Sequence, residues 1–378
     1  MKNLFTKFSL IAALCAIAVS SVSCDDDSKG GGDKPAVETS VSSLRFTSGS
    51  YSKSFEVDVK TAASWSVDVE FSGTDSWVTV EKSGDGVSVK VESNTGAART
   101  ATVVVSASGM TDAKVAVEQQ EAFSSELIGV YAPYVNPTSY DYGLFLSTEW
   151  NEKGAPSLDL SAILGAAIEW ETIEGLLPML IGSTYYSKGL ASLDLKGDGR
   201  LAAGYRVPEF EGGFSIESML NPQFDNSPVL VFPDAQAPVV PSDVVTYYTE
   251  NGKIYLAVSK EFIASVDPGT LDMPICDLID TFIKKYGLDF VSDRYNFAVP
   301  FKYKSENDVL TLYVDREMIL PFKPLLLDVL GMLLENGISE EGGDMPAFDP
   351  AMLTGFITDM FDNSTKFELG IKLAPKAE

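Results

Sequence analysis

Polar and apolar residues alternate strictly along Ser54-Phe55-Glu56-Val57-Asp58-Val59, in the N-terminal part of the chain. Alternation with a period of two predicts a β-strand with one buried face. The same pattern recurs at residues 65–69 and 87–91, and a turn signal, Ser83-Gly84-Asp85-Gly86, precedes the last of these. Several short strands separated by turn signals predict a β-sandwich.

These strands lie within residues 36–121, whose landmarks resemble a known domain family. In chain order the landmarks are Trp65, Trp77-Val78-Thr79-Val80, Gly84, Asn94, Arg99 and Val115-Ala116-Val117-Glu118-Gln119. The pattern resembles the BACON family, the Bacteroidetes-associated carbohydrate-binding domain that is often N-terminal. The resemblance implies an immunoglobulin-like sandwich on a secreted or surface protein. The family name proposes glycan or mucin binding, whereas many members look more like spacers. The resemblance therefore implies one of these two roles.

Two tryptophans of this stretch are candidates for stacking on sugar rings. Trp65 and Trp77 both stand in strand-like alternation rather than at loop tips. A buried tryptophan is usual in sandwiches of this kind, so the pattern favours packing in the core or at its edge over ligand contact.

Residues 1–23 have the three-part layout of a secretory signal peptide. Lys2 and Lys7 precede an apolar run at residues 8–19, and residues 20–23 are small. Cys24 follows at once, which resembles a bacterial lipobox and implies that its thiol carries a lipid anchor. Two or more acyl chains hold a protein stably on a membrane. An ordinary secretory signal with a chance cysteine is the alternative.

Residues 24–35 are predicted to form a flexible tether. Three aspartates follow the cysteine at 25–27 and three glycines stand at 30–32, which leaves too little apolar area to fold. The acidic run also resembles the surface-export signal of Bacteroidetes lipoproteins; a merely solubilising charge run is the alternative. We therefore expect a lipid-anchored protein of the outer membrane that faces outward.

The composition excludes several classes of function. The formal net charge of −26 repels phosphate backbones and anionic head groups, which argues against nucleic acid and favours neutral over anionic glycans. The chain has no histidine, which removes Ser-His-Asp and Cys-His catalysis and histidine-ligated zinc. Cys276 lies in an apolar helical pattern and is predicted to be buried. We expect no disulfide, no metal and no cofactor.

Residues 122–378 are predicted to form a larger α+β domain. The hairpin signals are Lys196-Gly197-Asp198-Gly199, Glu250-Asn251-Gly252 and Ser305-Glu306-Asn307-Asp308. The predicted strands are 127–134, 189–195, 200–207, 244–249, 253–259, 295–304, 309–316 and 365–373. Helical patterns lie between them at 159–177, 275–286, 324–335 and 351–361.

Two architectures are compatible with this order of elements. Gly129-Val130-Tyr131 near the first strand resembles the lipocalin-like domains of Bacteroidetes lipoproteins, which implies a barrel. The alternative is an open, curved, mainly antiparallel sheet with helices inserted in its connections.

Four tyrosines at the start of this domain are the candidate ligand-binding residues: Tyr131, Tyr134, Tyr140 and Tyr142. Their rings could stack on sugars while their hydroxyls bind sugar hydroxyl groups. The competing interpretation is a first strand whose tyrosines pack on the core and on a following loop. It is favoured because adjacent positions of a strand face opposite sides, so these rings would not share one face.

Acidic residues of the second domain do not form a recognisable catalytic or metal motif. A calcium loop that began at Asp194 would need an oxygen ligand at its third position and Glu at its twelfth, where Lys196 and Tyr205 stand. A plain hairpin turn over Asp194 to Gly199 is therefore favoured. Glu169 and Glu171 would diverge on a helix and cannot pair by local spacing. We predict no catalytic residues.

The sequence thus predicts a non-catalytic surface lipoprotein that binds a neutral glycan or glycoprotein. One alternative is a carrier whose apolar helices line a pocket for a hydrophobic ligand, with residues such as Leu326, Leu330 and Met352; core packing is the competing interpretation. A glycan-active enzyme that uses paired carboxylates is the third possibility.

Overall fold

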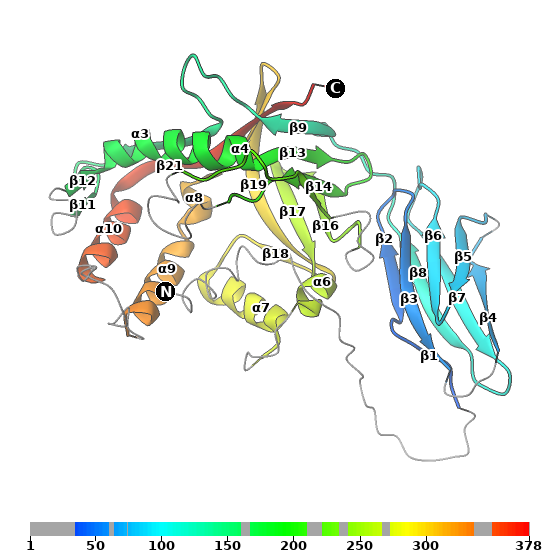
Figure 1. The fold of residues 1–378 in the computed structure, drawn as a ribbon. Helices are drawn as coiled ribbons and strands as arrows, with labels where there is room; N and C mark the ends of the chain where they lie inside the picture. Colours follow the sequence, from blue (N-terminus) through cyan, green and yellow to red (C-terminus); the bar gives the residue numbers. More distant parts are fainter. Residues whose placement is uncertain are drawn as a thin grey trace.

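The computed structural model describes residues 35–59, 64–73, 75–159, 167–209, 221–233, 241–266, 273–335 and 350–377. The predicted signal peptide, Cys24 and nearly all of the tether lie outside the described residues. Figure 1 shows a small all-β part and a larger part of strands and helices. The described chain is mostly β, and most of its strand pairs are antiparallel.

The N-terminal part consists of two four-stranded sheets, and the strands predicted there are confirmed. One sheet has the order β1-β3-β6-β5 and the other β2-β8-β7-β4. The strands are β1 (Glu38–Thr39), β2 (Ser43–Phe46), β3 (Ser52–Asp58), β4 (Trp65–Phe71), β5 (Val78–Ser83), β6 (Gly86–Val91), β7 (Arg99–Ala107) and β8 (Ala113–Gln119). Strand β2 runs parallel to β8, whereas the other pairs are antiparallel.

The two sheets share one hydrophobic core, which makes this part a sandwich. Phe46 and Val103 from one sheet pack with Phe55 and Val89 from the other. In β3, Phe55 and Val57 are buried while the residues between and beside them are exposed or half-buried, as the alternation of the sequence predicts.

The larger part is built on an eleven-stranded sheet. Its main path is β15 (Leu230–Phe232), β14 (Leu201–Tyr205), β13 (Leu190–Leu195), β9 (Gly129–Pro133), β21 (Ser364–Pro375), β20 (Val309–Asp315), β19 (Asn296–Glu306), β17 (Lys253–Ser259) and β16 (Val245–Glu250). Two further strands lie off this path: β10 (Leu144–Trp150) pairs with β21, and β18 (Val291–Ser292) pairs with β19. The eight strands predicted from sequence are confirmed, whereas β10, β15 and β18 were not predicted.

The large sheet is not closed into a barrel, so the barrel alternative is wrong and the open curved sheet describes the structure. Within the described residues β14 and β16 approach each other at an isolated bridge between Arg200 and Thr246. Full closure would need a continuous ladder between these strands. The inner face is filled by side chains, among which Leu195, Ile254 and Leu373 have no exposed surface.

Two strands, β9 and β10, pair with the same edge of β21, one after the other. Pro133 pairs with Leu373, and Leu144 pairs with Ile371. Both strands are antiparallel to β21, so they form one interrupted partner of it. The interruption is residues 134–143, which leave the sheet and return to it; we call this segment the tyrosine loop.

The helices agree with the sequence predictions at three places and differ at one. Helix α7 (Ile275–Tyr286) has the predicted bounds, and α9 (Phe322–Glu335) and α10 (Pro350–Asn363) lie within two residues of them. The helix predicted for 159–177 is wrong at its start. Two short strands, β11 (Ser157–Asp159) and β12 (Ala167–Glu169), pair there instead, and α3 (Trp170–Ile181) begins only afterwards. Short apolar runs suit a strand as well as a helix, which explains the error.

The remaining helical segments are short: the π-helix η1 (Gly182–Tyr186), α4 (Ser187–Gly189), α6 (Lys260–Ser265) and α8 (Arg316–Ile319). In the part of the chain that is described, no helix combines the length and the apolar character needed to cross a bilayer.

Helix α3 covers the outer edge of strand β10. The carboxylate of Glu174 accepts a hydrogen bond from the backbone N–H of Thr148 (2.8 Å), and the Trp170 indole donates to the Thr148 hydroxyl (2.9 Å). Trp170 also stacks edge-to-face against Trp150, with ring centroids 5.1 Å apart. An edge strand exposes unpaired backbone groups, and here a carboxylate of the helix binds one of them.

Candidate functional site

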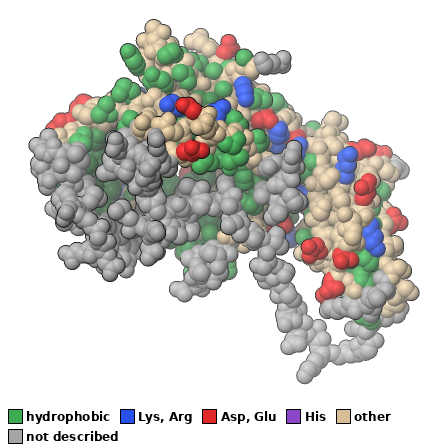
Figure 2. All heavy atoms as spheres, viewed as in Figure 1, with side chains coloured by type: hydrophobic (Ala, Val, Ile, Leu, Met, Phe, Trp, Pro, Cys, Tyr) green, Lys and Arg blue, Asp and Glu red, His purple; other side chains and the backbone are tan. Residues whose placement is uncertain are grey.

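The tyrosine loop carries the most exposed large apolar side chain of the described residues. Tyr140 is 71% exposed, and Val135 on the same loop is 44% exposed. Figure 1 shows the connection between β9 and β10 standing out beyond the sheet. In Figure 2, hydrophobic side chains gather over the top of the molecule, where this loop and α3 lie. The loop therefore presents an aromatic ring to solvent at a protruding position.

The loop is closed at its base by a short antiparallel contact. Asn136 and Asp141 exchange two backbone hydrogen bonds, at 2.7 and 3.1 Å. Tyr140 lies just inside this contact and has a φ of 55°. A left-handed backbone is uncommon for an aromatic residue and costs about 1–3 kcal/mol, so the surrounding contacts must hold it.

An ion pair fixes the loop to strand β21. The Lys372 ammonium lies 2.6 Å from an Asp141 carboxylate oxygen, and both side chains are about 70% removed from solvent. The other Asp141 oxygen accepts a hydrogen bond from the backbone N–H of Gly143 (3.0 Å). The Tyr186 hydroxyl donates to the backbone carbonyl of Lys372 (2.9 Å). The charges of Asp141 and Lys372 thus compensate each other beside the exposed ring.

Gly143, where the loop rejoins the sheet, cannot be replaced without strain. Its φ is +76°, and a Cβ there would lie 2.6 Å from the Tyr134 carbonyl oxygen and 2.9 Å from the Tyr186 ring. Only glycine adopts this conformation at so close an approach of two chain segments. Neither Gly143 nor the Asp141–Lys372 pair was identified from sequence, because both depend on a strand that lies far along the chain.

The structure does not bring the four predicted tyrosines into one site. Tyr131 is half-buried against the core, and its hydroxyl donates to the Leu127 carbonyl (3.1 Å). Burial raises its pKa above the usual range. Tyr134 and Tyr142 are half-buried at the base of the loop, where the Tyr142 Cβ lies close to Gly182. Tyr140 is the one of the four that is strongly exposed.

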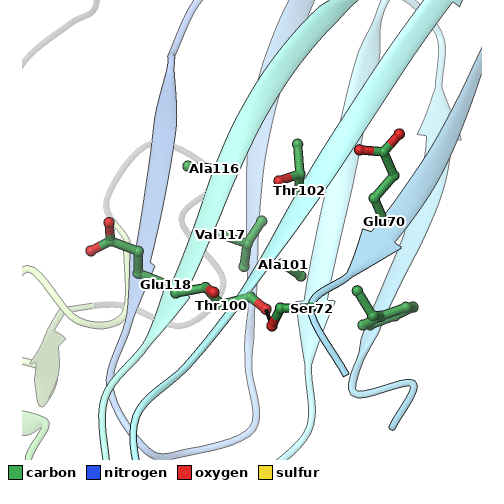
Figure 3. Close-up of a pocket in the computed structure, with 9 residues that line it drawn as sticks. Glu70, Ser72, Thr100, Ala101, Thr102, Ala116, Val117 and Glu118 are labelled. Carbon is green, nitrogen blue, oxygen red and sulfur yellow. Dashed lines mark hydrogen bonds between the residues drawn. The ribbon is translucent and has the colours of Figure 1, made fainter. Parts of the chain in front are cut away.

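The outer face of the sandwich holds a second candidate site. A shallow depression of about 400 Å³ lies over β4, β7 and β8. Figure 3 shows its side chains: Glu70, Ser72, Thr100, Ala101, Thr102, Ala116, Val117 and Glu118. Hydroxyl and carboxylate groups predominate among those that reach the surface, and they could bind the hydroxyl groups of a polar ligand. Lys114 lies 3.2 Å from Glu70 in an exposed ion pair.

The two tryptophans of the sandwich serve packing rather than display. Trp77 is 5% exposed within the core, and the Arg99 guanidinium lies 4.4 Å from its ring centroid. Trp65 is half-buried, and the Lys82 ammonium covers its ring at 3.7 Å. A sugar would have to displace these cations to reach either ring.

The acidic candidates of the second part are engaged in local contacts. Asp194 pairs with Lys196 (2.5 Å), and Asp198 pairs with Arg200 (2.7 Å), so the hairpin between β13 and β14 uses its own carboxylates. Glu171 is exposed on α3. In the described residues no group of three or more histidine, cysteine or acidic side chains is placed to hold a metal ion.

Cys276 differs from the prediction of burial. It is half-buried on the first turn of α7, and its thiol lies 3.6 Å from the Lys260 carbonyl. Helix α7 contains no fully buried residue, and the elements it packs against are the helices α6 and α9.

A groove beside α7 is the second surface depression. Its volume is about 420 Å³, and Lys260, Asp280 and Ser292 lie in it. Asp280 accepts hydrogen bonds from Ser292 and from Lys260. These bonds, of which the one from Ser292 has the larger effect, hold the pKa of the Asp280 carboxyl below its usual range. Lys260, Asp280 and Ser292 thus satisfy one another.

A known protein family matches the sequence of the sandwich. Residues 63–120 match the family model BACON, described as "Putative binding domain, N-terminal". No curated protein matches the chain.

Three solved structures from Bacteroides show partial likeness. A protein of Bacteroides thetaiotaomicron is 18% identical and covers 26% of this chain and 98% of its own, with a TM-score of 0.21. A GH5 xyloglucanase of Bacteroides ovatus, solved with a XXXG heptasaccharide, is 22% identical and covers 34% of this chain and 31% of its own, with a TM-score of 0.21. A DUF4784 family protein of Bacteroides caccae is 10% identical and covers 74% of this chain and 82% of its own, with a TM-score of 0.16. These TM-scores are low, so the likenesses carry no functional inference.

Proposed function

We propose, from the premise that residues 63–120 form a BACON domain, that this protein is a non-catalytic, lipid-anchored surface protein that binds a neutral glycan or glycoprotein. The observation that carries the proposal is the exposed ring of Tyr140 on the anchored tyrosine loop. The BACON match, over residues 63–120, supports a binding role for the sandwich.

The geometry of the loop suits a sugar ring. An exposed aromatic face can stack on the apolar face of a sugar, and its hydroxyl can bind a sugar hydroxyl group. The pairing at the base of the loop and the Asp141–Lys372 ion pair hold the ring in place before a ligand arrives, which lowers the entropic cost of binding. Because that ion pair is internally compensated, the loop favours an uncharged ligand.

A glycan array with the mature chain, residues 24–378, tests the proposal. We expect neutral glycans to bind in preference to sulfated or sialylated ones. Tyr140→Ala should weaken the best glycan about tenfold, the effect of losing one aromatic stacking contact, whereas Tyr140→Phe should keep most of the affinity. Absence of binding by the intact chain, or equal binding by Tyr140→Ala, would contradict the proposal.

A matched variant on the sandwich separates the two candidate sites. Thr102→Arg fills the depression on the outer face of β7 without touching the core. Loss of glycan binding in this variant, with binding retained in Tyr140→Ala, would place the site on the sandwich and not on the tyrosine loop.

The two alternatives from the sequence gain less support. A hydrophobic-ligand carrier needs an internal cavity, yet Leu195, Ile254 and Leu373 fill the curve of the large sheet. The groove beside α7 is lined largely by polar or charged side chains, whereas polar and apolar residues line the depression on the sandwich in similar measure. A carboxylate-dependent enzyme needs two carboxyl groups facing each other across a cleft. Asp194 and Asp198 are paired with lysine or arginine, Glu169 ends the strand β12, and Glu171 is exposed on α3.

A further inference from the structure

Strand β16, at one end of the large sheet, and β14, next to the strand β15 at the other end, meet at a seam beside the sandwich. One side of the seam is the turn that enters β14, and the other is the segment that enters β16. The Tyr247 backbone N–H donates to the Gly199 carbonyl (2.7 Å), and Arg200 forms the isolated bridge with Thr246. The Arg200 guanidinium also donates to the Ser242 hydroxyl (2.9 Å). The Tyr247 hydroxyl also donates to the Lys196 carbonyl (3.0 Å). Within the described residues these contacts do not form a continuous ladder between β14 and β16.

One side chain of the sandwich touches both sides of this seam. The Tyr51 ring packs against the Arg200 guanidinium, which lies 4.4 Å from the ring centroid. The Tyr51 hydroxyl donates to a carboxylate oxygen of Asp243 (2.8 Å). Tyr51 is itself held in the sandwich, because the backbone N–H of Thr47 donates to its hydroxyl (2.7 Å) and its ring lies against Phe46.

Buried charge reinforces the same contact. The Lys53 ammonium lies 2.8 Å from Asp243, and the two side chains are 15% and 11% exposed. Asp198 and Arg200 pair at 2.7 Å with 14% and 16% exposure. Removing one partner of a largely buried pair leaves an uncompensated charge, which is costly. The Lys53–Asp243 pair therefore holds the sandwich to the segment before β16, and the Asp198–Arg200 pair holds Arg200 in place against Tyr51.

The backbone of the sandwich is fitted to the seam as well. Gly49 lies so close to Asp198 that a Cβ would come within 1.8 Å of its carboxylate oxygen. Asp198 cannot move aside freely, because it holds Arg200. On the other side of the boundary, the Arg45 guanidinium stacks over the Tyr295 ring at 4.3 Å.

We infer that the sandwich is a clasp that holds β14 and β16 of the curved sheet together, rather than a spacer that swings free of it. On the side of β16, Tyr51 and Lys53 bind Asp243. On the side of β14, Tyr51 contacts Arg200 and Gly49 contacts Asp198. The sandwich thereby supplies the closure that the strand ladder of the sheet lacks.

Hydrogen exchange on the mature chain tests this inference. Asp243→Ala removes the common partner of Tyr51 and Lys53. We expect the amides of residues 244–250, which include the seam amide of Tyr247, to exchange about tenfold faster or more. Amides of β20 in the centre of the sheet and of β6 in the sandwich core should keep their protection.

Two further variants complete the test. Asp289→Ala breaks an Asp–Lys pair whose lysine, Lys253, lies at the start of β17, and it should leave the seam amide of Tyr247 unchanged. The exchanged pair Lys53→Asp with Asp243→Lys restores opposite charges and should recover most of the seam protection. Unchanged seam exchange in Asp243→Ala, or equal acceleration in β6, β20 and the seam, would overturn the inference.

Discussion

At the scale of single residues, the tyrosine loop concentrates backbone strain where it displays a side chain. Tyr140 has a left-handed backbone and an exposed ring, and three positions later Gly143 has a left-handed backbone in a crowded site. Strain of this kind persists only where neighbouring contacts over-determine it. Asp141, between them, provides such contacts: its carboxylate accepts a hydrogen bond from the Gly143 N–H and forms the ion pair with Lys372.

Gly143→Ala should therefore destabilise the protein by about 2–4 kcal/mol, from the cost of a left-handed alanine and from overlap with the Tyr134 carbonyl and the Tyr186 ring. Urea unfolding followed by circular dichroism measures this. Gly154→Ala is the matched control, because Gly154 also has a positive φ but no atom within 4 Å of the added Cβ. Similar losses in both variants would show that the crowding at Gly143 is unimportant.

A second prediction concerns alkaline pH. Burial, the stacked Tyr255 ring and nearby acids raise the pKa of Tyr248 to about 12, and burial likewise raises the pKa of Tyr51, Tyr186 and Tyr247. An unfolded tyrosine loses its proton near pH 10, so above that pH the unfolded chain binds fewer protons than the folded one. The free energy of unfolding should therefore fall as pH rises from about 10 towards 12.

The urea midpoint between pH 8 and about pH 12 reports this loss. Tyr248→Phe removes one of these tyrosine hydroxyls. The number of protons released on unfolding in that pH interval should therefore change by up to about one, and the free energy of unfolding should fall less steeply with pH. An unchanged slope in Tyr248→Phe would be evidence against a raised pKa at this ring.

At the scale of elements, helix α3 protects a sheet edge. Strand β10 pairs with β21 on one side, and Glu174 and Trp170 of α3 bind Thr148 on the other. The same strand continues, through the tyrosine loop, from β9. The position of the loop therefore depends on α3, because that helix holds the second half of the interrupted strand.

Glu174→Ala should cost about 1–3 kcal/mol, since it leaves the Thr148 N–H without its carboxylate acceptor at the strand edge. An uncovered edge should also increase self-association, which light scattering detects. Glu171→Ala, at an exposed position on the same helix, should change the free energy of unfolding by less than about 0.5 kcal/mol. Equal effects of the two substitutions would argue against edge protection by Glu174.

At the scale of the whole molecule, the clasp would make the sandwich and the large sheet one mechanical unit. A tether at its N-terminus would then carry a rigid body rather than two independently moving domains. The net charge of −26 would keep such a body away from anionic lipid head groups. The lipid predicted at Cys24 would supply the attachment that the charge opposes.

The anchor is tested by expressing the full chain in a Bacteroides host with a clickable fatty acid. The wild-type protein should be labelled and should enter the detergent phase of a Triton X-114 separation. Cys24→Ser should lose both properties, whereas Cys15→Ser, within the predicted signal, should retain both. A wild-type protein found unlabelled in the aqueous phase would refute lipidation and the location inferred from it.

The sequence by itself determined the elements whose signals are local. Alternation in 54–59 predicted β3, and Pro274 with Gly287 predicted both ends of α7. The Asn251-Gly252 turn likewise predicted the β16–β17 hairpin, in which both residues have positive φ. Such signals suffice because steric preference and face burial act within a few neighbouring residues.

Tertiary structure alone decided the shape of the sheet and the candidate site. Asp141 and Lys372 are 231 positions apart, and no local pattern relates them. The same holds for β10 on β21, for the seam between β14 and β16, and for the contacts of Tyr51 across it. Pairing between distant strands is chosen by the packing of the whole sheet, which a short window of sequence does not contain.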